Sequence, residues 1–477
     1  MSIAENADTK EILGKILDNE KLKNCFECGI CTASCSMVEL LDNEYNPRIL
    51  LEKIVLNPVE VLDSEKPWLC AWCYRCYKRC PQALKLPEIF LLMRTASLKQ
   101  GRTKPLDDAL QKIVESIPLP TVATLLCFHP ERAGLDKEQI TEKIQKIRGD
   151  CSKPKKKKKA QNSSKAKVGV IGSGPAGLTV ASELSRKGVS VTIFESLSGL
   201  GGMLRKCIPE HRLPAEVLNR EIQCITDAGV DVRTGVTLGR DLGFEDLWKE
   251  GYQAVFIGTG AHKSQELRIE GRQLKGVVNA LDFLWNVRSG KNLDVGKNVV
   301  VVGGGNVAVD AANTALKMGA KSVAILYRRS REEMPANPWE VKEAENEGVK
   351  IEFLVAPSKI LGETTVAAVE CVRTQLGEPD ESGRRKATPI QGSELKRETD
   401  MVILAIGETP DLSFLPKEIE TNEEGRVWVN PVTLETSMKG VFAGGDVARG
   451  PASVIEAICD GKKAAQSIEN YLKSLVG

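Results

Sequence analysis

The sequence has few histidines, no long apolar run and almost no net charge. Three histidines in 477 residues leave little scope for general acid–base chemistry. No apolar run approaches the roughly 18 residues that a membrane helix needs, and the first residues lack the basic end and the apolar stretch of a signal peptide. Lys and Arg number 66 against 64 Asp and Glu, so the net charge of +2 gives no overall field that would attract nucleic acid or an anionic membrane. We therefore expect a cytoplasmic protein whose partners include neither nucleic acid nor a membrane.

Cysteine, by contrast, is abundant and unevenly placed. Of the fourteen cysteines, eight lie between Cys25 and Cys80, and a reducing compartment gives such a group no use unless it binds something. The spacing C-x2-C-x2-C-x3-C occurs twice, at Cys25, Cys28, Cys31 and Cys35 and again at Cys70, Cys73, Cys76 and Cys80. The clustered cysteines therefore need a ligand, whereas the six scattered ones mostly do not.

This spacing is typical of two-cluster ferredoxins, in which three cysteines hold one 4Fe-4S cluster and the fourth ligates the other. We predict crossed ligation, with one cluster on Cys25, Cys28, Cys31 and Cys80 and the other on Cys70, Cys73, Cys76 and Cys35. Two structural zinc sites are the alternative, because C-x2-C pairs also suit tetrahedral zinc. Zinc usually takes two close pairs, so the third and fourth cysteines of each run favour iron–sulfur.

The two cysteine segments, CFECGICTASCS and WLCAWCYRCYKRCP, resemble the small iron–sulfur subunit of heterodisulfide reductases. The resemblance covers about residues 20–95 and implies a helical domain with two clusters. Beyond the cysteines, Pro87 and Pro105 each open a stretch with helical spacing. We expect residues 1–150 to form a helical iron–sulfur domain.

A Lys-rich segment, residues 151–167, follows this domain and has no large apolar side chain to anchor it. A nucleic-acid patch is one interpretation, but the neighbouring Ser and Asn residues and the neutral chain favour a solvated linker. After the linker, short Val/Ile-rich runs alternate with amphipathic stretches, as in parallel sheets built from β-α-β units. We expect two domains of this kind, one at residues 168–290 and 405–477 and the other at residues 291–404.

The first β-α-β unit carries a complete dinucleotide fingerprint. Gly172, Gly174 and Gly177 form G-x-G-x-x-G between a strand and a helix, and Glu195 follows 23 residues after the first glycine. Glycines let the backbone approach a pyrophosphate, the helix N-terminus stabilises its charge, and the acid hydrogen-bonds a ribose hydroxyl.

The second unit repeats the glycines at Gly303 and Gly305 but lacks the acid. Leu326 stands at the corresponding position, and three arginines follow it, Arg328, Arg329 and Arg331. Guanidinium groups pair with a 2′-phosphate, so NADPH is favoured over NADH, which stays possible. A basic surface loop is the alternative interpretation.

A third motif, GVFAGGDVARGPASVIEAIC, places Gly445 and Asp446 between a strand and a helix, as flavin binding requires. With GLGGMLRKCIPEHRLP, AVFIGTG and YRRSREEMPA, it resembles the small subunit of glutamate synthase and the related NADPH-dependent ferredoxin oxidoreductases, over roughly residues 165–475. The resemblance implies FAD contacts at Gly172, Gly174, Pro175, Ala176, Gly177, Glu195, Gly202, Leu204, Arg212, Gly260, Gly445, Asp446 and Ser453. It implies NADPH contacts at Gly303, Gly305, Asn306, Val307, Arg328, Arg329, Arg331 and Gly407.

The predicted fold class is therefore α/β, with two Rossmann-like dinucleotide-binding domains behind a helical two-cluster ferredoxin-like domain. No C-x2-C or C-x4-C occurs after residue 167, so electrons on the flavin have no cysteine pair to receive them. The predicted enzyme transfers electrons between NADPH, FAD and two 4Fe-4S clusters, to or from a redox protein partner in a larger complex. A stand-alone ferredoxin:NAD(P) reductase and a zinc-bearing scaffold are the competing hypotheses. The cysteine spacing departs from the glutamate synthase family, so glutamate synthesis is not carried over.

Overall fold

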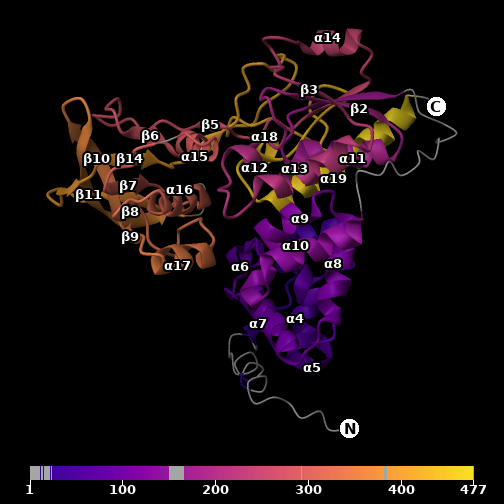
Figure 1. Cartoon of the computed structure of the whole chain (residues 1–477), viewed down its shortest axis with the longest axis horizontal. Coiled ribbons are helices and arrows are strands. Elements are labelled where there is room, and N and C mark those ends of the chain that lie inside the picture. Colours follow the sequence, from indigo (N-terminus) through magenta and orange to yellow (C-terminus); the bar gives the residue numbers. More distant parts are fainter. Residues whose placement is uncertain are drawn as a thin grey trace. The chain divides into compact units, whose positions relative to one another are not determined.

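A computed structural model describes residues 11, 14, 22, 24–149, 166–291, 293–380 and 384–475 (Figure 1). The chain forms two compact units. The first comprises Met1–Gly202, Arg212–Gly260 and Leu412–Gly477, and the second comprises Met203–His211 and Ala261–Asp411. Most of the predicted linker, residues 151–165, lies outside the described residues, and Lys167 already begins a strand.

The first part of unit 1 is helical between residues 24 and 149. Proline stands at the start of several of these helices, where its missing N–H costs nothing, and Asn46 caps one of them by accepting from the backbone N–H of Arg48 and Ile49. The helices predicted after Pro87 and Pro105 are confirmed. The elements are α2 (Ile30–Ala33), α3 (Ser36–Leu40), α4 (Pro47–Leu56), α5 (Pro58–Val61), η2 (Lys66–Leu69), α6 (Arg75–Arg79), α7 (Leu86–Lys99), α8 (Lys104–Ser116), α9 (Pro120–Ala123), η3 (Thr124–Phe128), η4 (Pro130–Ala133) and α10 (Lys137–Arg148).

Unit 1 also contains a five-stranded parallel sheet in the order β16-β4-β1-β2-β3. Its central strands are Val/Ile/Phe-rich and buried, as expected of a sheet covered on both faces. The strands are β1 (Lys167–Ile171), β2 (Ser190–Glu195), β3 (Asp231–Thr234), β4 (Ala254–Ile257) and β16 (Val441–Ala443). The helices are α11 (Pro175–Arg186), α13 (Ala215–Thr226), α14 (Phe244–Lys249), α18 (Asp446–Arg449) and α19 (Val454–Ser474).

Unit 2 is built on a second five-stranded parallel sheet in the order β6-β14-β7-β8-β9. Its strands are β6 (Val277–Asn279), β7 (Asn298–Val302), β8 (Ser322–Tyr327), β9 (Lys350–Phe353) and β14 (Met401–Leu404), and its helices are α12 (Met203–Lys206), α15 (Ala280–Arg288), α16 (Asn306–Lys317) and α17 (Pro338–Asn346). Antiparallel strands complete it: β10 (Val355–Gly362), β11 (Val366–Pro379), β12 (Arg385–Pro389) and β13 (Leu395–Glu398), and the pair β5 (Lys263–Ser264) and β15 (Glu408–Thr409).

The two parallel sheets and the helical segment agree with the predicted fold class. The compact units follow other bounds than the predicted domains, because residues 203–211, 261–290 and 405–411, which we predict for the FAD-binding part, lie in unit 2. The reason is strand pairing: β6 lies beside β14 and extends the second sheet. The helical segment and the first sheet also share one unit.

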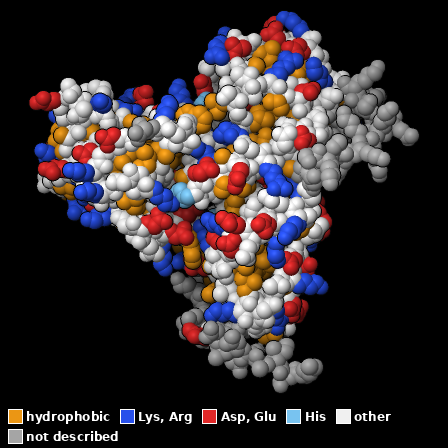
Figure 2. All heavy atoms as spheres, in the orientation of Figure 1, with side chains coloured by type: hydrophobic (Ala, Val, Ile, Leu, Met, Phe, Trp, Pro, Cys, Tyr) orange, Lys and Arg blue, Asp and Glu red, His pale blue; other side chains and the backbone are white. Residues whose placement is uncertain are grey.

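Acidic and basic side chains are interspersed on the face shown in Figure 2, as the small net charge leads one to expect. Over the described residues, no helix is both long enough and apolar enough to span a membrane.

Candidate cluster and nucleotide sites

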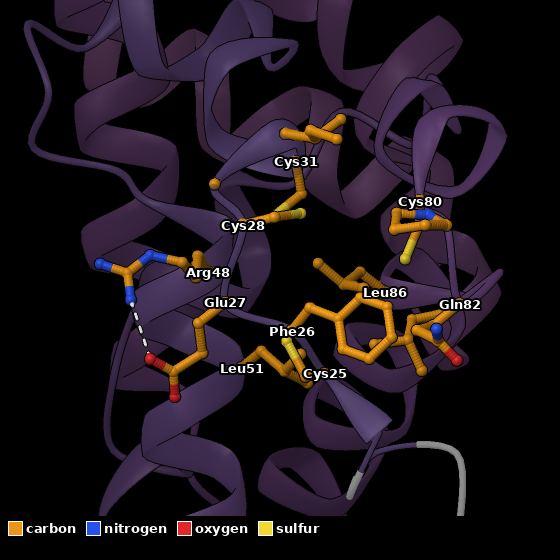
Figure 3. Close-up of a pocket in the computed structure, with 14 residues that line it drawn as sticks. Cys25, Phe26, Glu27, Cys28, Cys31, Arg48, Leu51, Cys80, Gln82 and Leu86 are labelled. Carbon is orange, nitrogen blue, oxygen red and sulfur yellow. Dashed lines mark ion pairs between the residues drawn. The ribbon is translucent and has the colours of Figure 1, made fainter.

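The first cysteine pocket is lined by Cys25, Cys28, Cys31 and Cys80, whose side chains surround it in Figure 3. Cys31 lies in the short helix α2, and Gly29, with a φ of 76°, turns the chain between Cys28 and that helix. Cys80 comes from a distant segment, where it follows the last residue of α6. The structure thus brings together the four cysteines that the spacing assigned to one cluster.

The remaining lining of this pocket is largely apolar, from Phe26, Leu51 and Leu86 among others. At its edge, Arg48 of α4 forms an ion pair of 3.9 Å with Glu27, drawn as a dashed line in Figure 3. Phe26 is 67% exposed and Cys28 is exposed as well, so this pocket reaches the surface of the described structure.

The second pocket is lined by the other four cysteines, Cys35, Cys70, Cys73 and Cys76. The loop that carries three of them has a left-handed backbone at Trp72 and Tyr74, with φ values of 48° and 57°. Such values strain non-glycine residues and persist only where the surroundings hold them. Here the two aromatic side chains are buried and meet edge to face, with ring centroids 5.7 Å apart. With these two side chains anchored in the core, Cys73 between them lines the pocket together with Cys70 and Cys76.

Burial dominates the acidity of these thiols. It raises the pKa of Cys35 to about 12 and that of Cys73 to about 11, and it also raises the pKa of Cys70. Thiols buried in this way lose their protons only when a cationic centre binds the sulfur, so iron binding must displace the protons.

The donor set fits a 4Fe-4S cluster in each pocket, because four thiols stand round an apolar space. In the described part of the chain, no three His, Cys, Asp or Glu side chains converge closely enough to hold a single metal ion. The cysteines of each set instead surround a pocket. Ligation by these sets remains our proposal.

The first glycine turn joins β1 to α11. A Cβ on Gly172 would lie 2.6 Å from the carbonyl oxygen of Gly258, and one on Gly177 would lie 2.1 Å from the carbonyl oxygen of Gly172. Neither position can accept a side chain without a backbone shift. Gly174 precedes the helix and Pro175 opens it, so the first backbone N–H groups of α11 remain available to an anion. Ala176 is buried in the first turn.

Glu195 ends β2 next to this turn and is buried. The backbone N–H and the hydroxyl of Ser173 donate to one of its carboxylate oxygens at 3.0 and 2.5 Å, and the N–H of Leu197 donates to the other at 2.9 Å. A Cβ on Gly202 would lie only 3.0 Å from the Cα of Gly174, which brings a second loop against the turn. The structure therefore places Glu195 and Gly202 beside the predicted pyrophosphate site.

Gly445 and Asp446 lie beside the same turn. A Cβ on Gly445, whose φ is 71°, would come within 3.1 Å of the Cβ of Ala176. Asp446 begins α18 and accepts from the N–H of Ala452 at 3.2 Å. Ser453 caps α19 in a reciprocal arrangement with Glu456, as in a capping box. Of the other residues predicted for FAD, Arg212 and Gly260 belong to unit 1, and Leu204 belongs to α12 of unit 2.

The second glycine turn joins β7 to α16 in unit 2. A Cβ on Gly303 would lie 2.0 Å from the carbonyl oxygen of Ala405, whereas one on Gly305 would meet nothing within 4 Å. Asn306 begins the helix, and its side-chain oxygen accepts from the N–H of Asn337 at 2.8 Å. Gly407, with a φ of 123°, follows β14, and Val307 lies in the first turn of α16.

The three arginines after β8 have different surroundings. Arg328 is exposed and makes no side-chain hydrogen bond or ion pair with a described residue. Arg329 is 4% exposed, pairs with Asp380 and donates to the carbonyl oxygen of Arg385 at 2.7 Å. Arg331 pairs with Glu345. Among the three, Arg328 is therefore the cation most available to a phosphate.

Sequence reasoning missed a contact between the second cysteine pocket and helix α19, whose N-cap residue, Ser453, is predicted to contact FAD. Ile455 lines that pocket, and Arg75, which lies between Cys73 and Cys76, forms an ion pair of 2.5 Å with Glu456. Arg75 and Glu456 are 381 residues apart in the sequence, so no local sequence pattern predicts their contact. The pocket thus adjoins the start of the helix that Ser453 caps.

Comparison with known proteins gives matches over both parts of the chain. The family model described as pyridine nucleotide-disulphide oxidoreductase matches residues 166–461, and the model described as 4Fe-4S dicluster domain matches residues 21–84. The β subunit of the NADP(+)-dependent formate dehydrogenase of Moorella thermoacetica is 38% identical over 86% of this chain and 61% of its own length. The β subunit of the NADPH-Fe(3+) oxidoreductase of Geobacter sulfurreducens is 37% identical over 83% of this chain and 63% of its own. The chain thus spans less than two thirds of these two relatives.

The small chain of the NADPH glutamate synthase of Escherichia coli is 39% identical over 64% of this chain and 69% of its own length, which confirms the predicted resemblance. Among solved structures, FprA from Mycobacterium tuberculosis in complex with NADPH superposes with a TM-score of 0.56 at 19% identity, over 66% of this chain and 86% of that one. T. acidophilum thioredoxin reductase gives 0.51 at 25% identity, over 65% and 98%. These structures share the fold.

Proposed function

Because the chain belongs to the pyridine nucleotide-disulphide oxidoreductase family and carries a 4Fe-4S dicluster domain ahead of it, we propose that it moves electrons between NADPH, FAD and two 4Fe-4S clusters. The second half of the proposal is that the electrons pass to or from a redox protein partner in a larger complex. The names of the relatives support it, since they are β subunits or small chains of NADPH-linked enzymes.

The observation that carries this proposal is the contact between the second cysteine pocket and the start of α19. Ile455 forms part of the pocket wall, and the Arg75–Glu456 ion pair fixes the cysteine loop to the same helical turn. FAD, when bound, accepts a hydride and releases its electrons singly. A carrier in this pocket would adjoin the helix that contributes Ser453 to the proposed flavin site.

The burial of the two pockets supports an order for the transfer. The pocket of Cys35, Cys70, Cys73 and Cys76 adjoins α19, whereas the pocket of Cys25, Cys28, Cys31 and Cys80 has an exposed Cys28 and an exposed Phe26. We assign the former to the flavin side of the route and the latter to the side that meets the partner.

Transfer of the flavin's electrons to a pair of redox-active thiols is disfavoured here. Among the described residues, the free cysteines outside the two pockets are Cys127, Cys207, Cys371 and Cys459, and all four are buried. Burial raises the pKa of Cys207 to about 12 and that of Cys371 to about 11, so these thiols stay protonated at neutral pH and react poorly.

The test is an anaerobic titration of the purified chain with NADPH and then NADH, following flavin absorbance and the electron paramagnetic resonance of reduced clusters together. We expect NADPH to bleach the flavin and to produce paramagnetic clusters, with NADH less effective. A protein that contains zinc and no iron would overturn the proposal in favour of a scaffold. If the flavin bleaches while intact clusters stay oxidised, ferredoxin-driven reduction of NADP becomes the better assignment.

A further inference from the structure

A buried arginine, Arg94 of α7, lies beside the second cysteine pocket. None of its surface is exposed, and its guanidinium donates to backbone carbonyl oxygens at 2.9 Å (Pro67), 2.6 Å (Phe128), 3.4 Å (Trp68) and 2.8 Å (Cys70). Within the described residues no carboxylate forms an ion pair with it. Its hydrogen-bonding groups are thus satisfied, while its charge is not neutralised by an acid in contact.

A buried charge without a partner is costly, and several hydrogen bonds to neutral carbonyls remove only part of the cost. A guanidinium stays cationic in proteins at neutral pH, so the buried group carries its charge. It donates to the carbonyl oxygen of Cys70 at 2.8 Å, which places that charge next to a proposed cluster ligand. A negatively charged centre on Cys70 would therefore supply the missing counter-charge.

Tyr45 is a second buried polar group at this pocket. Its side chain is 1% exposed and lines the pocket beside Cys70, close enough for its hydroxyl to act on that thiol. A hydrogen bond to a ligand sulfur and a nearby positive charge both favour the more negative state of an iron–sulfur centre. The two residues thus act in the same direction on one ligand.

We propose that Arg94 and Tyr45 raise the reduction potential of the cluster held by Cys35, Cys70, Cys73 and Cys76. The proposal rests on the proposed function, since it requires a cluster in this pocket. Each arriving electron, which comes from NADPH through the flavin, adds one negative charge with no proton transferred and no bond changed. The fixed charge of Arg94 and the phenol of Tyr45 stabilise that added charge inside a buried site, where solvent screens it little.

The first pocket lacks this arrangement. Its nearby cation, Arg48, is partly exposed and already paired with Glu27 at 3.9 Å, so its charge is largely compensated. The effect should therefore be confined to the cluster on Cys70, and the other cluster provides an internal reference in the same molecule.

The experiment is a redox titration of the full chain with mediators and dithionite, followed by electron paramagnetic resonance. At the wild-type midpoint of the second cluster, we expect Arg94→Gln to lower its reduced-to-oxidised ratio about tenfold, equivalent to ~59 mV for one electron. Arg94→Lys, which keeps the charge, should stay close to wild type. Tyr45→Phe should lower the ratio about threefold. Lys99→Gln, which removes an exposed cation from the same helix, is the matched control and should change nothing.

An unchanged potential in folded Arg94→Gln, or an equal shift in Arg94→Gln and Arg94→Lys, would overturn the role of the charge. If Arg94→Gln does not fold, Tyr45→Phe decides, because it removes only a hydroxyl: an unchanged midpoint then overturns the proposal. Dithionite reduces the clusters without NADPH or FAD, so the titration reports the clusters independently of the flavin. A wild-type chain that lacks two clusters would contradict the proposed function. Clusters that are present but insensitive to these residues would contradict only the role of Arg94 and Tyr45.

Discussion

Arg328 and Arg329 are neighbours in the sequence but have opposite surroundings. Arg328 is exposed, whereas Arg329 is buried and held by Asp380 and the carbonyl oxygen of Arg385 on the β11–β12 hairpin. A guanidinium that is already paired in a buried site supports the local structure, and a free one can meet a ligand phosphate. We therefore expect Arg328 to recognise the phosphate and Arg329 to support the local structure.

Replacing Arg328 with Ala should weaken NADPH by the worth of a charge-assisted contact, about 1.5–3 kcal/mol, or roughly 10- to 150-fold in KM. NADH, which has no 2′-phosphate, should be little affected, and so should thermal stability. Steady-state kinetics with both cofactors gives the comparison. Arg329→Ala is the contrasting variant, expected to lower the melting temperature because it removes a buried guanidinium that pairs with Asp380 and donates to the carbonyl oxygen of Arg385. Unchanged discrimination between the cofactors in Arg328→Ala would contradict the 2′-phosphate assignment.

The glycines of the first turn offer a second prediction at this scale. Gly177→Ala should unfold the turn locally, because its Cβ would lie 2.1 Å from the carbonyl oxygen of Gly172. Gly174→Ala meets nothing closer than 4.0 Å and has an ordinary φ of −67°, so the empty protein should tolerate it. We expect both variants to lose flavin, measured by absorbance, but only Gly177→Ala to lower the melting temperature of the flavin-free protein. Full flavin content in Gly174→Ala would mean that the pyrophosphate does not approach this residue.

At the scale of elements, the start of α19 combines a helix cap with a tertiary contact. Glu456 accepts from the N–H and hydroxyl of Ser453 at 3.0 and 2.7 Å, and its other oxygen meets Arg75 of α6 at 2.5 Å. Although burial raises it, the hydrogen bonds from Ser453 and the charges of Arg75 and Arg449 hold the pKa of Glu456 below its ordinary value. One carboxylate thus caps the start of a helix and fixes the cysteine loop to it.

A lowered pKa in the folded state means that the unfolded chain binds the proton more tightly. The contribution of Glu456 to folding stability is therefore present above its ordinary pKa of 4.5, and it is lost as the pH falls through the lowered folded-state pKa. We expect Glu456→Gln to lower the free energy of unfolding at pH 7 by about 1.5–3 kcal/mol, the worth of hydrogen bonds to a charged group. Denaturant unfolding between pH 7 and pH 3 should show the variant and the wild type converging in acid. A constant difference over this range would contradict the linkage.

The sequence predicts the features that depend on local spacing, but not those that depend on contacts between distant residues. The glycine turns and the two runs of cysteines follow from spacings of a few residues. The crossed grouping of the cysteines follows from the known pattern of two-cluster ferredoxins. The Arg75–Glu456 pair joins residues that are 381 positions apart, and the environment of Arg94 is set by carbonyl oxygens of other segments. Neither contact could be predicted from the sequence. The place of residues 261–290 in unit 2 likewise depends on a distant contact, the pairing of β6 with β14.

At the scale of the whole molecule, the cysteine sets imply that single ligands should have unequal consequences along the route. Cys80 lines the pocket with exposed residues, and Cys35 lines the pocket that adjoins α19. We expect Cys80→Ser to spare flavin reduction by NADPH and reduction of the second cluster, while transfer to an external acceptor such as ferric iron falls at least tenfold. Cys35→Ser should also spare flavin reduction but leave the first cluster oxidised, because the electrons that reduce this cluster pass through the damaged pocket.

Anaerobic stopped-flow absorbance with freeze-quenched paramagnetic resonance separates the steps, with iron content as the control for assembly. If the first cluster is reduced at the wild-type rate in Cys35→Ser, the proposed order is wrong, and if Cys80→Ser damages only the Cys70 cluster, the crossed ligation is wrong.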